Sequence, residues 1–542
     1  MSIAAKPARD LIRRAFAAAA LLALAACARA PGPGGANAEL RLAINAEPRS
    51  LVPMLGQSIQ DNEILRLIYD PLVACDGAGR PVPALAAEVP SRANGGISRD
   101  GLTVTYHLRH DVRWHDGTAF TSADVLASFR AVVDPRSVVS TRHGYDVVAR
   151  ADAPDRFTVR FRLKRPFAPF VGTIFAENDA PFYVAPAHLL RGGSLAQSPL
   201  NSAPVGTGPF RAVRWARGDR LELAANASYW QGKPALARVV VRFITDENTQ
   251  LVGLRSGDLD GVIGMSANAA ANARGIPHVR IATAPLNAYW GVMMNNGAGH
   301  ATADVRVRRA LALAIDAGSF RANVTHGFYA PPIADLPAVL WAADRTQRPI
   351  VHDAAAARTL LASAGYGPAH PLALELAILQ SSQTHRVEAV ALQSELKRVG
   401  VEVRVHPYLP NVYDAPPSQG GILSRGRYDI AFYGWYAGMD PDDSGQFMCD
   451  QRPPNGYNHS FYCSAAMDAA QRDALVRYDL PARKRAYARI EALLLSDVPI
   501  AFLGSPVAIS ALRDGIGGFG PSLVTQTANA QKWTLREPSE RR

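Results

Sequence analysis

The stretch from Pro204 to Pro234, PVGTGPFRAVRWARGDRLELAANASYWQGKP, constrains the fold more than any other part of this sequence. Its Gly-Thr-Gly-Pro segment predicts a turn, because Gly allows a positive φ and Pro presets the next bend. Residues 210–215 and 221–225 then read as two short strands joined by a Gly-Asp turn. Residues 237–244 are too apolar for a half-exposed strand. We therefore expect a β-hairpin that leads into a buried sheet.

The same stretch has a more specific pattern than a hairpin needs: VGTGPF, a Trp five residues later, and then N-x-x-YW-x-G-x-P. This pattern resembles the extracytoplasmic solute-binding proteins of peptide and nickel ABC importers, bacterial solute-binding protein family 5. Residues 100–120, DGLTVTYHLRHDVRWHDGTAF, and residues 304–332, DVRVRRALALAIDAGSFRANVTHGFYAPP, carry two further resemblances to that family. The resemblance extends from about residue 40 to residue 510.

The length of the chain predicts more than one domain, since a single hydrophobic core stops growing at about 250–300 residues and this chain has 542. The resemblance implies an α/β fold of two lobes, the large three-domain variant of the type II periplasmic-binding-protein fold, with a hinge and an interlobe cleft. We expect this division: the first part of lobe I over residues 39–76, an inserted subdomain over 77–204, the second part of lobe I over 205–288, lobe II over 289–500, and a return to lobe I with a C-terminal tail over 501–542.

Helix and strand patterns alternate in the predicted lobe II. Asp353 and Gly365 bound a helix, residues 385–399 form another, and strands are expected over 372–379, 401–405 and 429–435. This order favours an α/β lobe with a mostly parallel sheet. The end of the last strand should lie at the cleft, where α/β sheets bind ligands.

The remaining helices follow from capping residues and apolar periodicity. A short amphipathic helix is predicted over residues 61–69, and Leu102 to Leu108 alternates as a strand with one exposed face. Further helices are expected over residues 121–133, 246–257, 304–315, 465–478 and 481–496.

The first residues have the pattern of an export signal. Basic residues precede the apolar run 15–26, which is long enough for a signal peptide and too short to span a bilayer. Residues 1–26 end in Leu-Ala-Ala before Cys27, which resembles a bacterial lipobox and implies cleavage before Cys27 and its lipidation. The alternative is an ordinary signal peptide that happens to contain Cys. Residues 27–38 are a flexible tether. We expect a lipid-anchored protein outside the cytoplasm, in the periplasm or on the outer cell surface.

The other cysteines predict one disulfide. Cys449 and Cys463 flank a Pro-Pro-Asn-Gly turn at a separation that suits a bridge in an oxidising compartment, and some members of the family carry a bridge in this loop. Closing such a loop stabilises a protein by about 3 kcal/mol in the chain-entropy model. Cys75 is expected to be a buried free thiol.

Several functional classes are disfavoured. His107, His110 and His115 lack a carboxylate at helical spacing that would complete a metal site, so we expect no metal and no cofactor. The net charge of +11 is scattered, without the basic run and interleaved aromatics of a nucleic-acid-binding protein. No catalytic signature is present, and we expect the protein not to be an enzyme.

The candidate ligand wall is Gly-Trp-Tyr-Ala-Gly-Met-Asp-Pro over residues 434–441, with Asn-Gly-Tyr-Asn-His over 455–459. These segments look like the family's W-x-x-D…DP loop and the N-G-x-N that follows it. The resemblance, with the predicted cleft loops and crossover, implies these ligand-binding residues: Gln57, Ser58, Tyr289, Trp290, Asn295, Trp435, Gly438, Asp440, Asn458 and His459. For Trp435, a place in the core is the alternative to a stacking wall.

The candidate wall differs from the family at one position. Relatives that hold a free peptide amino terminus place an Asp two or three residues after the Trp, whereas this chain has Ala437 and Gly438 there. The counter-ion for an ammonium group is therefore missing, unless Asp440 replaces it. Blocked peptides, longer peptides, glycosides, opines and metal chelates all remain compatible ligands.

The resemblance implies a monomeric substrate-binding lipoprotein of an ABC transporter. Such a protein captures peptides or a related small solute in the interlobe cleft, closes on them, and delivers them to the transmembrane subunits of a permease. A sensor or chaperone of the same fold, without a transport role, is the alternative. An exported hydrolase is a further one, because a catalytic triad need not be local in sequence.

Overall fold

The structure is a computed structural model that describes residues 38–56, 58–139, 141–178, 182–190 and 195–536. The predicted signal peptide, Cys27 and Gln57 lie outside the described residues, as does all of the predicted tether except its last residue.

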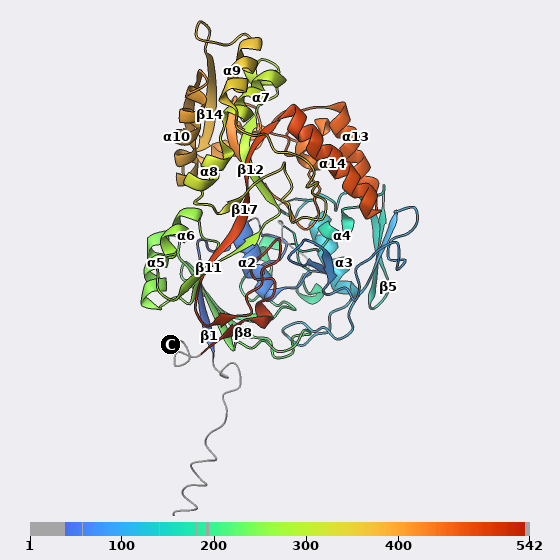
Figure 1. Ribbon diagram of the computed structural model, residues 1–542. Helices are drawn as coiled ribbons and strands as arrows, with labels where there is room; N and C mark the ends of the chain where they lie inside the picture. Colours follow the sequence, from blue (N-terminus) through green and yellow to red (C-terminus); the bar gives the residue numbers. More distant parts are fainter. Residues whose placement is uncertain (1–37, 57, 140, 179–181, 191–194, 537–542) are drawn as a thin grey trace, which may run out of the picture.

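A sheet of twelve strands runs through both lobes, in the order β15-β14-β16-β12-β17-β10-β1-β9-β8-β7, with β11 and β13 also paired to β17. The strand that joins the two halves is β17 (Ile500–Arg513), whose first residues pair with β12 (Ala288–Met294) and whose later residues pair with β10 (Gly261–Ile263) and β11 (Val279–Pro285). In Figure 1 it runs as one long arrow between the upper and the lower part of the molecule. A single strand thus belongs to the sheet of both lobes.

The lower half of this sheet contains the predicted hairpin. Strands β7 (Phe210–Ala216) and β8 (Arg220–Ala225) pair antiparallel, and β8 pairs with β9 (Arg238–Phe243). β9 in turn lies parallel to β1 (Glu39–Ile44). The sequence prediction of a hairpin that leads into a buried sheet is confirmed.

The glycines before the hairpin act differently from the prediction. Neither Gly206 nor Gly208 has a positive φ. A Cβ atom on Gly206 would lie 1.9 Å from the carbonyl oxygen of Ile68, and one on Gly208 would lie 2.6 Å from its carbonyl carbon. Gly is required here because the turn packs directly against the backbone at the end of a helix.

The upper half of the sheet is mixed. β14 (Leu372–Leu379) lies parallel to β15 (Val401–Tyr408) and to β16 (Ile430–Tyr436), as the alternation of helices and strands predicts. β12, however, pairs antiparallel with β16 and with β17. The expectation of a mostly parallel sheet holds for one side of lobe II only, because β12, which enters from lobe I, runs opposite to both of its neighbours.

Within the predicted inserted subdomain, β4 (Thr103–His107), β6 (Thr158–Leu163) and β5 (Val148–Asp155) form a separate three-stranded sheet. Val104 and Tyr106 on β4 are buried and their neighbours are more exposed, which is the predicted alternation. Helix α3 (Ser122–Val133) begins after Thr121, in a capping box with Asp124.

The other elements complete both lobes around this frame. The helices are α2 (Ile59–Ile68), α4 (Phe170–Thr173), α5 (Glu247–Ser256), α6 (Ala267–Ala273), α7 (Val305–Ala314), α8 (Ala317–Asn323), α9 (Ala354–Ser363), α10 (Gln383–Lys397), α11 (Pro410–Tyr413), α12 (Ser444–Phe447), α13 (Ala465–Val476) and α14 (Leu480–Asp497). The short strands are β2 (Val73–Cys75), β3 (Pro81–Pro83), β13 (Tyr329–Ala330), β18 (Ile516–Gly517) and β19 (Thr534–Leu535). Among the described residues, no helix combines the length and the apolar character that crossing a membrane requires.

Helix α2 has no exposed polar face, contrary to the prediction of an amphipathic helix. Its polar residues are buried with its apolar ones. Glu63 accepts hydrogen bonds from the backbone of Gln526 and Thr527 and from the hydroxyl of Thr525. Arg66 forms an ion pair with Asp70, 2.8 Å away. The polar face that the sequence shows is therefore covered by the C-terminal segment of the chain.

Asp70 is the point on which the stretch 204–234 converges. Its carboxylate accepts hydrogen bonds from Arg66 (2.8 Å), Thr207 (3.2 Å), Tyr229 (3.0 Å) and Trp230 (2.9 Å). Glu177 lies 3.6 Å from the Arg66 guanidinium. We call these six residues the Asp70 cluster. It explains physically why Tyr and Trp follow the hairpin: both side chains donate to one buried carboxylate.

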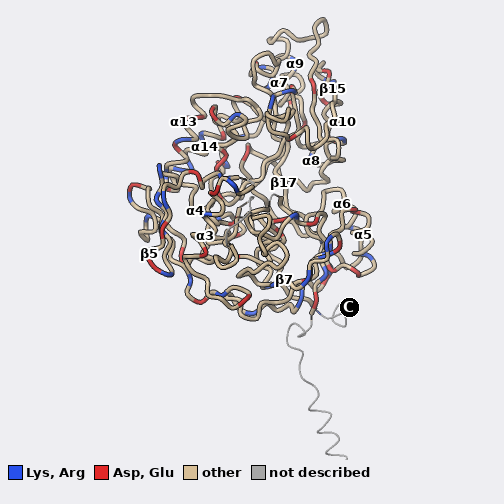
Figure 2. Tube along the Cα trace, turned by 180° about the vertical axis from the view of Figure 1, so that it is seen from behind, with Lys and Arg blue, Asp and Glu red and all other residues tan. Residues whose placement is uncertain are grey.

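Positions of Lys and Arg are interspersed with those of Asp and Glu along the described part of the chain trace (Figure 2). The formal charge of +11 is thus distributed over the described part of the molecule rather than gathered on one element.

Candidate functional site

A cavity of about 580 Å³ lies between the inserted subdomain and lobe II. This volume falls within the range of roughly 300–1,000 Å³ that is typical of small-molecule sites. The wall from the inserted subdomain includes His143, Tyr145, Asp146, Gly172, Asn178 and Phe182. The wall from lobe II includes Trp435, Gly438, Asp440, Asp443, Gln446 and Tyr457.

Strand β16 positions the aromatic part of the lobe II wall. Trp435 lies near its end and lines the cavity, where the ends of α/β strands are expected to meet a ligand. Its ring packs against Tyr457, with the ring centroids 5.2 Å apart. The structure therefore places Trp435 where the sequence predicted a wall.

Gly438 lets the two walls approach each other. A Cβ atom at Gly438 would lie 2.4 Å from the Cβ atom of Asn178, so a side chain would require Asn178 to move. The carbonyl oxygen of Gly438 accepts a hydrogen bond from Asn287 at 2.8 Å. The site of the absent family Asp is thus occupied by a close contact between lobe II and the inserted subdomain.

Asp440 lines the cavity, but its charge is already paired. Two guanidinium nitrogens of Arg483 lie 2.6 Å from its two carboxylate oxygens. The side chain of Arg483 is buried against Tyr487 and Trp341. A bidentate pair of this kind is strong, so the structure does not favour Asp440 as the replacement counter-ion for an ammonium group.

His143 and Asp442 connect the two walls. The Nε2 atom of His143 lies 3.0 Å from Oδ2 of Asp442, and these residues come from opposite sides of the cavity. Burial raises the pKa of Asp442, but its hydrogen bonds with His143 and Ser444 lower it by more. The net result is a pKa of about 2. Asp442 is therefore ionised at neutral pH, and its contact with His143 connects the two walls.

Three other carboxyl groups lie together beside the cavity. Burial, with the nearby charge of Glu491, raises the pKa of Asp335 to about 7, and burial raises that of Asp443 well above its ordinary value. Burial also raises the pKa of Glu491 to about 7. We call these three residues the Asp443 cluster. At neutral pH it retains at least one proton, because two carboxylates that share a buried site cannot both be ionised.

The Asp443 cluster escaped the sequence analysis. Asp335 precedes a loop, Asp443 follows the Asp-Pro segment, and Glu491 lies in helix α14. None belongs to a motif, and more than a hundred residues separate Asp335 from Asp443 in sequence. The same holds for the wall from the inserted subdomain. No local signal in the sequence could have identified these residues.

Tyr289 and Trp290 are not cavity residues in the predicted sense. They are neighbours on β12, so their side chains point to opposite faces of the sheet. Trp290 donates to Oε1 of Glu388 at 3.0 Å, within the core of lobe II. Tyr289 is buried and donates to Oε1 of Gln446. Trp290 thus has a structural role in lobe II, whereas Tyr289 supports Gln446 and lines a small void beside the cavity, so that its ligand-binding role stays a prediction.

Four further predicted site residues have structural roles. Asn295 donates to the carbonyl oxygens of Gly426 and Tyr428, and Asn458 donates to those of Met448 and Tyr462. Burial lowers the pKa of His459 to about 4, and its ring packs against Tyr433. Ser58 caps helix α2 through the backbone of Asp61, 3.1 Å away. These polar side chains contact the backbone of loops, the start of a helix or a neighbouring ring, and they do not line the cavity.

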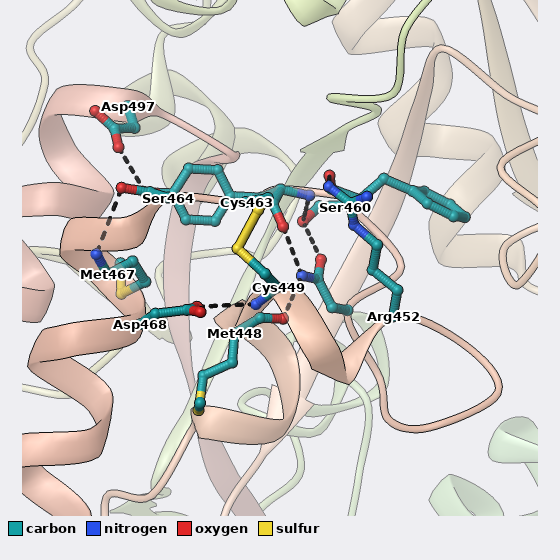
Figure 3. Close-up of a disulfide and its surroundings, with 12 residues drawn as sticks. Met448, Cys449, Arg452, Ser460, Cys463, Ser464, Met467, Asp468 and Asp497 are labelled. Carbon is teal, nitrogen blue, oxygen red and sulfur yellow. Dashed lines mark hydrogen bonds between the residues drawn. A yellow bond between two sulfur atoms is a disulfide. The ribbon is translucent and has the colours of Figure 1, made fainter.

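The disulfide supports one edge of the cavity. Cys449 and Cys463 are joined by the predicted bridge, with Cα atoms 4.6 Å apart. Figure 3 shows the backbone nitrogen of Cys449 donating to Asp468, at 2.9 Å. The loop that the bridge closes contains Asn455, Gly456 and Tyr457, which line the cavity. Cys75 is a buried free thiol, as predicted.

The histidines considered for metal binding lie apart from the cavity. His115 contacts the carbonyl oxygen of Gly208 at 3.0 Å, and His107 lies on the exposed face of β4. Among the described residues, no group of three or more His, Cys, Asp or Glu side chains could hold a metal ion.

Comparison with known proteins identifies similar chains along nearly the whole sequence. The family model of the bacterial extracellular solute-binding proteins, family 5 (middle), matches residues 80–456. Protein XP55 of Streptomyces lividans is 29% identical over 501 residues, which cover 90% of this chain and 87% of that protein. Di/tripeptide-binding protein 2 of Pseudomonas aeruginosa is 27% identical over 483 residues, which cover 83% of this chain and 86% of that protein.

A solved structure shows the same architecture. The ABC transporter substrate binding protein CtaP from Listeria monocytogenes matches with a TM-score of 0.81 and 25% identity. The match covers 93% of this chain and 100% of that one.

Proposed function

The chain belongs to the bacterial extracellular solute-binding proteins, family 5, and we propose that it captures short peptides in the cavity between its inserted subdomain and lobe II. The substrate-binding role in an ABC transporter follows from the family and its relatives. The identity of the ligand and the residues that bind it are proposals.

The observation that carries the proposal is the position of the cavity. Its walls come from two parts of the chain that meet through a few contacts, such as those of Gly438 with Asn178 and of His143 with Asp442. A ligand that touches both walls binds the closed arrangement better than the open one, and so shifts the equilibrium toward closure. A permease can then distinguish the loaded protein from the empty one.

The size and lining of the cavity support a short peptide. A volume of about 580 Å³ suits a ligand of drug-like size rather than a long chain. Trp435, Tyr457, Tyr145 and Phe182 offer aromatic surface, against which apolar side chains are desolvated. A curated relative is named a di/tripeptide-binding protein.

We further propose that the protein works as a monomer that docks on the transmembrane subunits of a permease. Cys27 would carry a lipid that tethers it to a membrane outside the cytoplasm, with no other membrane segment. The spacing of Cys27 after its apolar run supports this. Catalysis is not part of the proposal, because the family consists of substrate-binding proteins.

The proposal is tested with protein that begins at residue 38. Native mass spectrometry identifies co-purified ligands, and thermal unfolding with di- and tripeptide pools measures binding. At about one hundred times the Kd, a ligand stabilises the folded state by about 2.7 kcal/mol. We expect Trp435→Ala to lose most of this stabilisation. Trp215→Ala is the matched control, because Trp215 lies on β7, far from the cavity in sequence and in the sheet.

The outcomes separate the candidate functions. A heterogeneous set of peptides supports the proposal. One defined non-peptide ligand keeps the transport role and overturns the peptide assignment. Absence of any ligand, with no stabilisation by the peptide pools, favours a sensor or chaperone of the same fold. Turnover of a peptide that persists in Trp435→Ala favours a hydrolase.

A further inference from the structure

A small void of about 10 Å³ adjoins the main cavity behind Trp435 and Gln446. We propose that this void, which we call the side pocket, binds a primary ammonium group of the ligand between Asp335 and Asp443. This inference rests on the proposed function, since it names the charged group that the same site selects.

The side pocket communicates with the main cavity. Trp435, Ala437, Asp443 and Gln446 line both spaces. Asp335 lines the side pocket and not the main cavity, so it lies at the inner end. The residues that the two spaces share therefore place the side pocket directly beside the main cavity.

The side pocket contains polar atoms that the protein leaves unused. Both carboxyl oxygens of Asp335, Oδ2 of Asp443 and Nε2 of Gln446 are buried and form no well-shaped hydrogen bond with a described donor or acceptor. The three residues are 3%, 5% and 2% exposed, respectively. Buried polar atoms of this kind are rare in folded proteins, because each costs free energy unless a partner satisfies it.

The side chains around these atoms fix their orientation. Gln471 donates to Oδ1 of Asp443 at 2.7 Å, which leaves Oδ2 free. Tyr289 donates to Oε1 of Gln446, which leaves the NH₂ group of that amide as a donor. The pocket thus presents carboxyl oxygens beside one amide donor. This set matches an amino group and the carbonyl group next to it, as at the amino terminus of a peptide.

The size of the side pocket selects among cations. About 10 Å³ is the space of one water-sized group, which an –NH₃⁺ group fills and a planar guanidinium exceeds. A carboxylate would be repelled by the carboxyl groups. A metal ion lacks a ligand set, since no group of three such side chains among the described residues could hold one.

The charge of the Asp443 cluster also favours an ammonium group. The ion pairs of the described residues include none to Asp335, Asp443 or Glu491, whereas Asp440 and Asp442 are paired with Arg483 and His143. The titratable groups that act on the cluster are Asp335, Asp344, Asp442, Asp443, Lys484 and Glu491, with the phenols of Tyr289 and Tyr487.

A proton takes the place of the cation in the empty protein. The carboxyl groups of Asp335 and Asp443 lie close enough for each to affect the pKa of the other, so in the empty protein the pair keeps a proton. When an ammonium group enters, this proton leaves to bulk water and the ammonium donates to both carboxylates. The charge of the buried site stays the same, and so the exchange avoids an unpaired buried charge.

The test compares trialanine with N-acetyl-trialanine by isothermal titration calorimetry on the full mature chain. Acetylation removes the ammonium group, and a charged hydrogen bond contributes about 1.5–3 kcal/mol. We therefore expect acetylation to weaken binding by about tenfold to a hundredfold. Asp443→Asn should abolish this difference, as should Asp335→Asn, a second variant in case the first fails to fold. Asp473→Asn, an exposed residue of α13, should retain it.

Calorimetry in two buffers of different ionisation enthalpy provides a second signature. Near pH 7, trialanine binding should release protons, and N-acetyl-trialanine binding should not. If the wild type bound the two peptides with equal affinity, the proposal that the side pocket binds an ammonium group would be wrong. The proposed peptide function would remain. An equal loss of affinity for both peptides in Asp443→Asn would lead to the same conclusions.

If neither peptide binds, the proposed peptide function fails, and the side pocket is tested by infrared spectroscopy. Methylammonium should remove the carbonyl band of the protonated carboxyl groups in the wild type. Tetramethylammonium, which exceeds the pocket, should not. A band that methylammonium leaves unchanged, or an ordered water that stays in the pocket, would overturn the inference.

Discussion

The Asp70 cluster and the Asp443 cluster both contain buried carboxyl groups. The two clusters differ in how the charge of these groups is compensated. Asp70 accepts four hydrogen bonds and pairs with Arg66. Asp335 and Asp443 have no ion-pair partner among the described residues and leave oxygens unused. A buried carboxylate that is paired with a cation fixes the relative positions of chain segments, whereas buried carboxyl groups without a cation beside a cavity are available to a ligand.

The location of the two clusters agrees with this contrast. The Asp70 cluster joins α2 to the stretch 204–234 in the interior of lobe I. The Asp443 cluster lies where β16 ends and α14 passes, next to the main cavity. We predict that substitutions in the first cluster mainly change stability and that substitutions in the second mainly change ligand selection.

The largest effect is expected for Asp70→Ala. Removing one partner of a buried ion pair costs about 3–5 kcal/mol of the free energy of unfolding; here Arg66 would keep only one carboxylate partner, the more distant Glu177, and three further donors would lose their acceptor. Urea denaturation measures the loss. Asp473→Ala, which removes an exposed pair with Arg477, should cost less than about 1 kcal/mol. A similar small loss for Asp70→Ala would remove the contrast between the clusters.

The next largest effect is expected from removing the disulfide at the edge of the cavity. Replacing Cys449 and Cys463 together by Ser should lower the free energy of unfolding by about 3 kcal/mol, because the unfolded chain is no longer cross-linked. Ligand affinity should fall as well, since the loop carries Tyr457. Cys75→Ala is the control, as this thiol lies in the core of lobe I. If the double variant bound ligand as tightly as the wild type, the loop would not be part of the site.

A smaller effect should appear as a dependence of stability on pH. Asp335 and Glu491 have pKa values of about 7 in the folded protein, above their ordinary values. Their contribution to stability is complete below about pH 4 and is lost as the pH rises through 7. For each such group, the free energy of unfolding should fall by about 2–3 kcal/mol between about pH 5 and pH 7 and then level off.

Urea denaturation at a series of pH values measures this dependence. Asp335→Asn should flatten it, because an amide does not titrate. A wild-type stability that rises over the same range would show that the Asp443 cluster is ionised in the folded state.

The smallest effect on ligand affinity is expected for the contact of His143 with Asp442 between the two walls of the cavity. His143 is half exposed, and exposed ion pairs contribute about 0.2–1 kcal/mol. His143→Ala should therefore weaken ligand binding by about fivefold at most, with little change in unfolding. His188→Ala is the matched control, because His188 pairs with Asp116 within the inserted subdomain and does not cross the cavity. Equal effects of the two substitutions on binding would show that the contact has no role in closure.

Much of the fold was predictable because its signals are local. Asp246 and Gly257 bound α5, and Asp353 begins α9. The hairpin of β7 and β8 follows from its turn residues and alternation. Such features depend on neighbours within a few residues, and these are visible in a sequence.

Errors arose where the tertiary structure sets the environment. Helix α2 looks amphipathic, but its polar residues are covered by the segment around Gln526. Trp290 seemed a cleft residue, but the pleat of β12 turns it to the core of lobe II. In both cases the sequence showed the pattern of residues correctly. It did not show which other part of the chain these residues contact.

The sequence by itself determined the elements, the disulfide pairing, the family and the position of Trp435 at a strand end. Only the tertiary structure decided which groups meet at the cavity, because its walls come from residues 141–182 and 435–457. The same is true of the raised pKa values of Asp335 and Asp443, which follow from burial and from neighbouring carboxyl groups. Burial and long-range contacts are properties of the folded chain, and no local pattern encodes them.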